Sequence, residues 1–388
     1  MSQLRISGKP EDWTNWEKLI EQCSTYDEFT DIEKEKAERA FLFLKHEFGE
    51  EFLKNAFEEL HPIMYYFVNS APWTRKWLTR VADSLTTLKK MEGYASLLKR
   101  LKDKDKFFEG KSVLEIAYKF SKTGFRIFID PPLSNNVKVP DLKITNGKTG
   151  EELFVEVSVQ QQSINHTKAI RTFDEIFNQL SPFCGLIYCG RVFRILSERH
   201  MVDVIKTVKD KIDMAKKENA FQELIIEDTI ELGIAPSKET DVLTAWAKSR
   251  GLEIGYFVGP PFNTDEIPRT RHKIWKEQLQ LPRTSANIVV IENNNLFRSV
   301  KDIKREISDL EECLYDFSNL LCLIGIGFYE CYDGKMQDEI VKRDQHSVIR
   351  RLREDSTAEH CMILYNRYCD FHVSPSTIDK VYLAFTKY

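Results

Sequence analysis

The chain has 388 residues, more than one hydrophobic core usually holds, so we expect two domains or one domain with a large insertion. Its composition, 42% hydrophobic and 30% charged, is ordinary for a globular protein. The formal net charge of −4 excludes a global positive field that would attract nucleic acid, so a nucleic-acid partner would need a local basic patch.

The cysteines and the apolar segments indicate a cytoplasmic protein. The eight cysteines form no CxxC pair, which argues against a zinc ribbon and favours reduced, buried thiols. The first residues contain no apolar run that could serve as a secretory signal. The longest apolar segment, Leu320 to Tyr329, is too short to span a bilayer, so we predict a buried strand there and no membrane partner.

Residues 1 to 108 are predicted to form an all-helical N-terminal domain. Helix-forming residues with apolar side chains at helical spacing run from Ile32 to Phe48. A further helix begins at Pro72, and another contains Tyr94 to Leu101. The charged stretch from Lys102 to Lys106 follows, and we place the domain boundary just past it.

Residues 109 to 388 are predicted to form an α/β domain. A short helix with an apolar face from Val113 to Phe120 ends at Gly124. A strong turn signal, Asn146 to Gly150, separates two of the strands that follow. Three strands are predicted here: Phe125 to Ile129, Asp141 to Thr145 and Leu153 to Gln160.

The rest of this domain is predicted to continue with alternating elements and one insertion. We expect a largely helical insertion from about residue 200 to 282, with one strand-like run at Ile254 to Val258. The other predicted elements are a helix at His166 to Leu180, strands at Cys184 to Cys189 and Ala286 to Ile291, and an amphipathic helix at Ser299 to Phe317.

The hairpin carries the most informative pattern. Its two strands alternate apolar and polar residues, so one face carries Asp141, Lys143, Glu156, Ser158 and Gln160. A turn that closes symmetrically about Lys148 and Thr149 places Asp141 directly opposite Glu156. Two like charges so placed are destabilising, and a divalent cation such as Mg²⁺ or Mn²⁺ between them would compensate. The alternative is a solvated polar face with no site.

Residues 110 to 160 resemble the core of the PD-(D/E)XK, or restriction-endonuclease-like, nucleases. That core has a helix carrying a Glu, a strand, a Pro-Asp at the next strand, and a hairpin leading to a strand with Glu-x-Lys. In this chain Glu115, Pro140–Asp141 and Glu156 match those positions. The resemblance implies that the following core helix is His166 to Leu180 and that the next core strand begins at Cys184. It implies a central mixed sheet flanked by helices.

One position departs from the family pattern, because the motif lysine is replaced by Ser158. Three residues could compensate. Lys143 lies on the same polar face as Asp141, and Lys168 lies near the start of the next helix. Gln160 could orient a water molecule without charge. The alternative is an inactive protein that keeps only the fold.

The activity that the resemblance implies is metal-dependent hydrolysis of phosphodiester bonds in DNA. Asp141, Glu156 and the carbonyl of Val157 would hold the metal ion, and Glu115 would bind a second ion or a metal-bound water. Lys143 or Lys168 would stabilise the negative charge that develops on the phosphate.

A basic cluster offers a candidate nucleic-acid surface: Arg269, Arg271, Lys273 and Lys276. The alternative is the solvated face of a helix whose Ile274, Trp275 and Leu279 pack inside.

Other enzyme classes lack their motifs. No HExxH pair, P-loop, GxGxxG or GxSxG elbow occurs. A metal-dependent nuclease is therefore the leading prediction. The rival is a non-catalytic module that uses the same fold to bind nucleic acid or a protein. The N-terminal helices could bind a protein partner, and a homodimer is possible.

Overall fold

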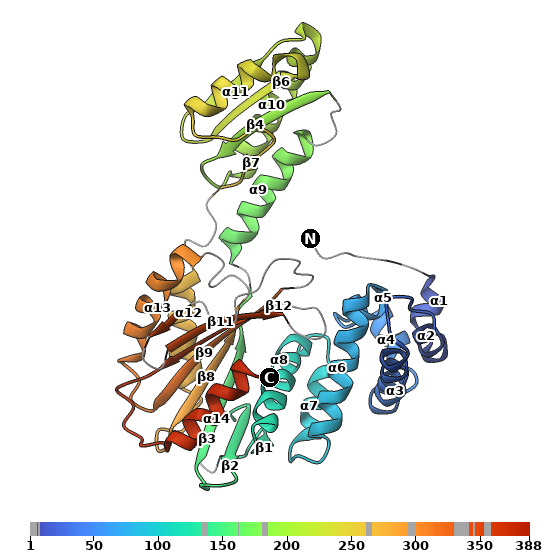
Figure 1. Ribbon diagram of the computed structural model, residues 1–388, viewed down its shortest axis with the longest axis vertical. Coiled ribbons are helices and arrows are strands. Elements are labelled where there is room, and N and C mark those ends of the chain that lie inside the picture. Colours follow the sequence, from blue (N-terminus) through green and yellow to red (C-terminus); the bar gives the residue numbers. More distant parts are fainter. Residues whose placement is uncertain are drawn as a thin grey trace. The chain divides into compact units, whose positions relative to one another are not determined.

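The computed structural model divides the chain into two compact units, residues 1–160 with 267–388, and residues 161–266 (Figure 1). The residues that it describes are 6, 8–133, 139–161, 163–180, 185–260, 266–293, 300–329, 341–343, 346–352 and 358–388. Two predicted starting residues, Cys184 of a strand and Ser299 of a helix, lie outside the described residues. The described part is a mixed α/β protein with a large mixed sheet flanked by helices.

Helices fill the N-terminal part of the first unit, as predicted. Thr30 and Glu33 form a capping box that starts the third helix, and Gly49, with a φ of 98°, ends it. Pro72 occupies the first turn of the sixth helix. The helices are α1 Pro10–Trp13, α2 Trp16–Cys23, α3 Asp31–Phe48, α4 Phe52–Glu58, α5 Met64–Val68, α6 Pro72–Leu88, α7 Tyr94–Lys102 and α8 Phe107–Lys122.

The large sheet has the strand order β1-β2-β3-β8-β9-β12-β11-β10. Neighbouring strands β3, β8 and β9 run parallel, and the other pairs are antiparallel. The strands predicted at residues 125–129, 141–145, 153–160, 286–291 and 320–329 all lie in it, with ends that shift by at most one residue. The strands are β1 Phe125–Ile129, β2 Leu142–Asn146, β3 Glu152–Val159, β8 Asn287–Glu292, β9 Leu320–Tyr329, β10 Val341–Arg343, β11 His346–Leu352 and β12 Ala358–Tyr365.

Helices cover both faces of this sheet (Figure 1). Helices α8 and α14 (Pro375–Thr386) pack on the face that carries Val155 and Val157. Helices α12 (Glu266–Gln278) and α13 (Val300–Leu314) pack on the opposite face, where Ile274 and Phe154 belong to one apolar cluster. The polar face of β3 is therefore covered by α12 and not solvated.

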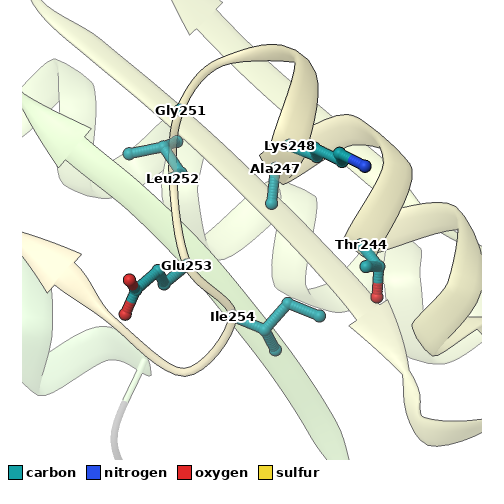
Figure 2. A pocket seen from close by; sticks show the side chains of 7 residues that line it. All are labelled: Thr244, Ala247, Lys248, Gly251, Leu252, Glu253 and Ile254. Carbon is teal, nitrogen blue, oxygen red and sulfur yellow. The ribbon is translucent and has the colours of Figure 1, made fainter.

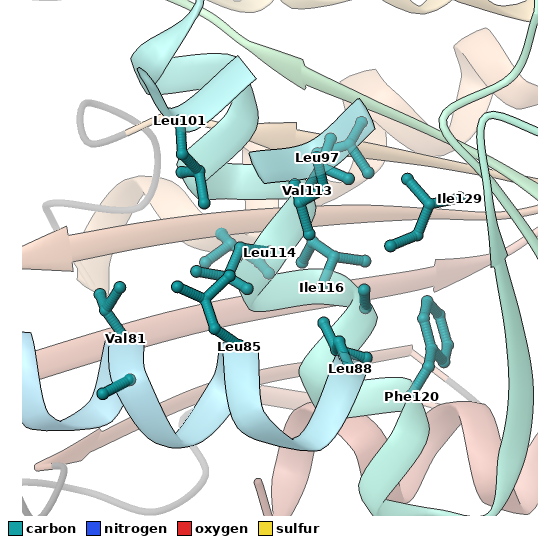
Figure 3. Close-up of a cluster of buried hydrophobic side chains, with 14 of the residues drawn as sticks. Val81, Leu85, Leu88, Leu97, Leu101, Val113, Leu114, Ile116, Phe120 and Ile129 are labelled. Atoms are coloured by element: carbon teal, nitrogen blue, oxygen red, sulfur yellow. The ribbon is translucent and has the colours of Figure 1, made fainter. Parts of the chain in front are cut away.

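The N-terminal helices share one core with the sheet. Figure 3 shows side chains of α6, α7, α8 and β1 in a single cluster, including Leu85, Leu97, Ile116 and Ile129. Burying each such side chain stabilises the fold by about 1.5–3 kcal/mol. The expected division at residue 108 therefore does not separate two compact units. The chain divides instead around residues 161 and 266.

The second unit is a small α/β body inserted between β3 and α12, with the strand order β5-β6-β4-β7. The region predicted to be largely helical thus contains strands, because their short apolar runs resemble helix faces in isolation. Its elements are α9 Ile164–Leu180, β4 Leu186–Val192, α10 Glu198–Glu218, β5 Gln222–Ile226, β6 Ile230–Pro236, a 3₁₀ turn at Ser237–Glu239, α11 Thr240–Ser249 and β7 Phe257–Val258.

The insertion corrects one assignment from the family resemblance. Strand β4 pairs with β6 and β7, so it is not the core strand beside β3. Strand β8 pairs in parallel with β3 instead, and α12 is the helix that precedes it. The local pattern could not reveal this, because more than one hundred residues of sequence separate the two paired strands.

An open depression in the second unit lies where α11 ends (Figure 2). Its lining is mostly apolar, with Lys248 and Glu253 as the charged members. The described residues include no helix that is both long and apolar enough to cross a membrane.

Candidate active site

Asp141 and Glu156 stand at matching positions on neighbouring strands. Leu142 pairs with Val155, and Ile144 pairs with Leu153, so the next position along the ladder places Asp141 opposite Glu156. This is the register that the symmetric turn predicts. Both side chains are buried, each with 7% of its surface exposed.

Asp141 is held by two kinds of donor. Its Oδ2 accepts a 2.9 Å hydrogen bond from the main-chain N–H of Val157, and its Oδ1 forms an ion pair with Arg100 of α7. Arg100 also pairs with Asp130, which accepts a hydrogen bond from Ser96. Burial raises the pKa of Asp141, and the charge of Arg100 opposes that rise.

A close helix–strand approach brings Arg100 to this position. Gly93 precedes α7 with a φ of 83°, and a Cβ there would lie 1.9 Å from the carbonyl oxygen of Ile129. Only glycine combines this backbone angle with that contact. Gly93 therefore sets α7, and with it Arg100, against the end of β1.

Glu156 has one satisfied oxygen and one without a partner. Its Oε1 accepts a 3.0 Å hydrogen bond from the side-chain amide of Gln280. Its Oε2 is buried and has no hydrogen-bond partner among the described residues. Burial, together with the negative charges of Asp141 and Glu277, raises the pKa of Glu156 to about 10. A protein without a cation at this point would therefore keep Glu156 protonated at neutral pH.

Helix α12 supplies the other polar groups on this face. Glu277 Oε1 accepts a 3.0 Å hydrogen bond from Ser158 Oγ and lies 3.1 Å from Lys273 Nζ. Gln280, just past the helix, donates to both Glu277 and Glu156. Lys273 and Ser158 therefore contact the same carboxylate, that of Glu277. Ser158 stands at the position where the family motif has its lysine.

Sequence reasoning did not identify Glu277 and Gln280, and it assigned Lys273 to the outer surface. One signal was present: Thr270, Ile274 and Glu277 recur at helical spacing, which puts two polar residues on the same stripe as an apolar one. In the structure all three are buried. Thr270 Oγ1 donates to Gln160 Oε1 at 3.1 Å, so the amide of Gln160 is engaged by this helix.

Three of the predicted site residues lie elsewhere. Glu115 lies on α8, which covers the face of the sheet opposite to Glu156, and forms a 2.7 Å ion pair with Arg80. Lys143 lies 3.1 Å from Glu152, toward the turn of the hairpin. Lys168 is an exposed residue of α9 in the second unit. The alternation of residues along each strand predicts which face of the sheet a side chain lies on. It does not predict which charged group a long side chain will pair with.

The charges of the site leave a net negative value. Four carboxylates, those of Asp130, Asp141, Glu156 and Glu277, face two cations, Arg100 and Lys273. If all are ionised, two negative charges remain, which one divalent cation would neutralise.

The donor set fits Mg²⁺ or Mn²⁺ better than Zn²⁺. Within the described residues, no three or more His, Cys, Asp or Glu side chains are placed to hold a metal ion. Mg²⁺ is usually bound by one or two carboxylates and keeps several waters. Asp141 and the unpartnered oxygen of Glu156 meet that requirement. The N–H and C=O of one strand residue point to the same side, so the Val157 carbonyl lies on the same edge of β3 as the N–H that contacts Asp141.

The basic cluster on α12 is divided between two faces. Lys273 turns inward to Glu277, whereas Arg271 and Lys276 are exposed and Arg269 is half-buried. Of the three apolar residues expected to pack inside, only Ile274 does so. Trp275 is 52% exposed and Leu279 is 50% exposed, because the buried stripe of this helix is narrower than the sequence suggested.

Comparison of the chain with protein-family models, with curated proteins and with solved structures gave no match.

Proposed function

We propose that this protein is a Mg²⁺- or Mn²⁺-dependent nuclease of the PD-(D/E)XK type that hydrolyses phosphodiester bonds in DNA. The observation that carries the proposal is the buried, unpartnered Oε2 of Glu156 beside the carboxylate of Asp141. Burying two facing carboxylates without a cation is unfavourable, so this pair favours a bound ion.

The order of elements supports the restriction-endonuclease-like part of this proposal. Helix α8, strands β1, β2 and β3, helix α12 and strand β8 follow one another as the resemblance implies, once the second unit is treated as an insertion between β3 and α12. The carboxylates lie where β2 begins and β3 nears its end.

The residues of the site would divide the work of the reaction. Asp141, Glu156 and the Val157 carbonyl would hold the ion, which supplies a more acidic bound water and neutralises charge on the phosphate. Arg100 and the Val157 N–H hold Asp141 in place. Lys273, held by Glu277, would stabilise the charge that develops on the phosphate oxygens. Ser158 fixes Glu277 and thereby the orientation of Lys273.

A nuclease assay with a matched control tests the proposal. Wild type, Glu156→Gln and Glu152→Gln are incubated with plasmid and single-stranded DNA in Mn²⁺. Glu152 is an exposed carboxylate on the same strand, so its substitution controls for loss of one negative charge. We expect Glu156→Gln to lose at least ~100-fold in rate and Glu152→Gln to cleave as wild type. Equal activity of all three proteins would refute the site.

A second candidate is a nuclease-fold module that binds nucleic acid or a protein without cleaving it. The ion pair between Arg100 and Asp141 favours it, since a guanidinium already compensates one of the two carboxylates. In that case Glu156 stays protonated and the protein binds no Mn²⁺. Isothermal titration of wild type and Glu156→Gln with MnCl₂ distinguishes the candidates. The nuclease requires Mn²⁺ binding by wild type that Glu156→Gln abolishes, whereas the non-catalytic module requires no binding by either protein.

We also propose a cytoplasmic location. Five cysteines of the described residues are buried free thiols, which fits a reducing compartment. They are Cys23, Cys189, Cys313, Cys322 and Cys361.

A further inference from the structure

Helix α12 has two polar faces with different surroundings. Its inner face contacts the candidate site through Thr270 and Glu277. Its outer face exposes aromatic and basic side chains, which are Arg271, His272, Trp275 and Lys276, and the exposed Leu279 follows in the turn just past the helix. The outer face does not pack against the core, because Ile274 on the inner face makes that contact with the sheet.

Two flat rings lie together on this outer face. The His272 and Trp275 ring centroids are 5.9 Å apart, and the ring planes are inclined by 24°. Trp275 keeps 52% of its surface exposed. Tryptophan is highly buried on average, and an exposed aromatic face is a group on which unpaired bases stack.

The charge around the rings favours a polyanion. Arg271 and Lys276 flank the pair, and the two glutamates of this helix, Glu266 and Glu277, are buried away from it. Within the part of the chain that the structure describes, Glu312 of α13 opposes this charge and lies 3.9 Å from Arg271. Lys276 and the rings therefore carry most of the expected attraction for a phosphate backbone and its bases.

We propose that the outer face of α12 binds single-stranded DNA, with an unpaired base stacked on Trp275 and His272 and with phosphates near Lys276 and Arg271. This inference rests on the proposed function for its choice of DNA, and it names unpaired strands as the substrate class. The same helix holds Lys273 and Glu277 on its other side, so a strand bound there lies about one helix diameter, ~10–12 Å, from the site.

The test measures binding in the absence of cleavage. Fluorescence anisotropy of a labelled oligo(dT) strand is recorded with the full chain carrying Glu156→Gln, in EDTA, so that a failed nuclease site cannot change the result. We expect the added change Trp275→Ala to weaken binding about tenfold. Trp275→Phe, which keeps a ring, should retain most of the affinity. Leu279→Ala, an equally exposed apolar truncation in the turn just past the helix, should leave affinity unchanged.

Two further arms identify the occupant. Lys276→Gln should weaken binding and lower the salt dependence by about one phosphate contact, whereas a duplex of the same length should not depend on Trp275. Equal oligo(dT) binding by Trp275→Ala would overturn the proposal. So would loss of self-association by Trp275→Ala in sedimentation without any change in DNA binding, because the face would then contact a second copy of the chain.

Discussion

The main-chain N–H of Val157 donates a 2.9 Å hydrogen bond to the carboxylate of Asp141. Val157 directly follows Glu156, so this bond holds the Asp141 carboxylate close to the second acidic residue. Burial and Asp141 together raise the pKa of Glu156. Its Oε2 has no hydrogen-bond partner among the described residues. The site is therefore electrostatically incomplete.

The stability of the metal-free protein should depend on pH through Glu156. Its pKa is about 10 in the folded protein and about 4.3 in an unfolded chain, so between these values only the folded state holds the proton. The free energy of unfolding then falls as pH rises, by on the order of 1 kcal/mol per pH unit. Glu156→Gln should remove this part of the slope. Denaturant titrations in EDTA from pH 6 to 8 measure it, and parallel curves for the two proteins would contradict the prediction.

A divalent cation should stabilise the folded protein. At a free Mg²⁺ or Mn²⁺ concentration of 100 times Kd, we expect a gain of about 2.7 kcal/mol in the free energy of unfolding. Asp141→Asn and Glu156→Gln should each abolish the gain in thermal unfolding, and Glu152→Gln should keep it. The prediction fails if the metal stabilises the two site variants as much as wild type.

Arg100→Gln should change stability and metal affinity in opposite directions. Loss of the ion pairs to Asp130 and Asp141 should cost about 2 kcal/mol or more in EDTA. The same change removes a positive charge next to the metal site, so Mn²⁺ should bind more tightly by titration calorimetry. Arg39→Gln breaks an exposed pair with Glu35 and is the control. Weaker Mn²⁺ binding by Arg100→Gln would show that the guanidinium does not compete with the ion.

Lys273→Met should reduce the rate of cleavage without removing the metal. Its ammonium lies 3.1 Å from Glu277, the acceptor of the Ser158 hydrogen bond. We expect a loss of about 100-fold in kcat with unchanged Mn²⁺ affinity, and partial recovery with Lys273→Arg. Lys276→Met, on the outer face, should alter KM instead. A kcat for Lys273→Met within a few fold of wild type would remove this residue from the reaction.

Local sequence patterns predicted the hairpin well. The turn at Asn146 to Gly150 and the alternation on both strands set which residues share a face, and the symmetric closure predicted the pairing of Asp141 with Glu156. These signals all lie within one hairpin. They also fix its register, because a slip by one residue would put Leu142 and Val155 on the polar side.

Long-range pairing could not be predicted in the same way. The helix at residues 164–180 and the strand after it continue the chain directly, so the local pattern places them in the core, yet they belong to the inserted unit. The partner of β3 is β8, whose apolar run carries no mark of the strand that it will join. Contacts such as Arg100 with Asp141 or Ser158 with Glu277 depend on that topology.

The most direct test of the central claim locates the ion itself. Anomalous scattering from crystals grown with MnCl₂ should give a peak within coordination distance of Asp141 and Glu156, with the Val157 carbonyl as a further ligand. Crystals of Glu156→Gln grown in the same way should lack it. An empty site in wild-type crystals at saturating Mn²⁺, or a metal bound elsewhere, would contradict the account.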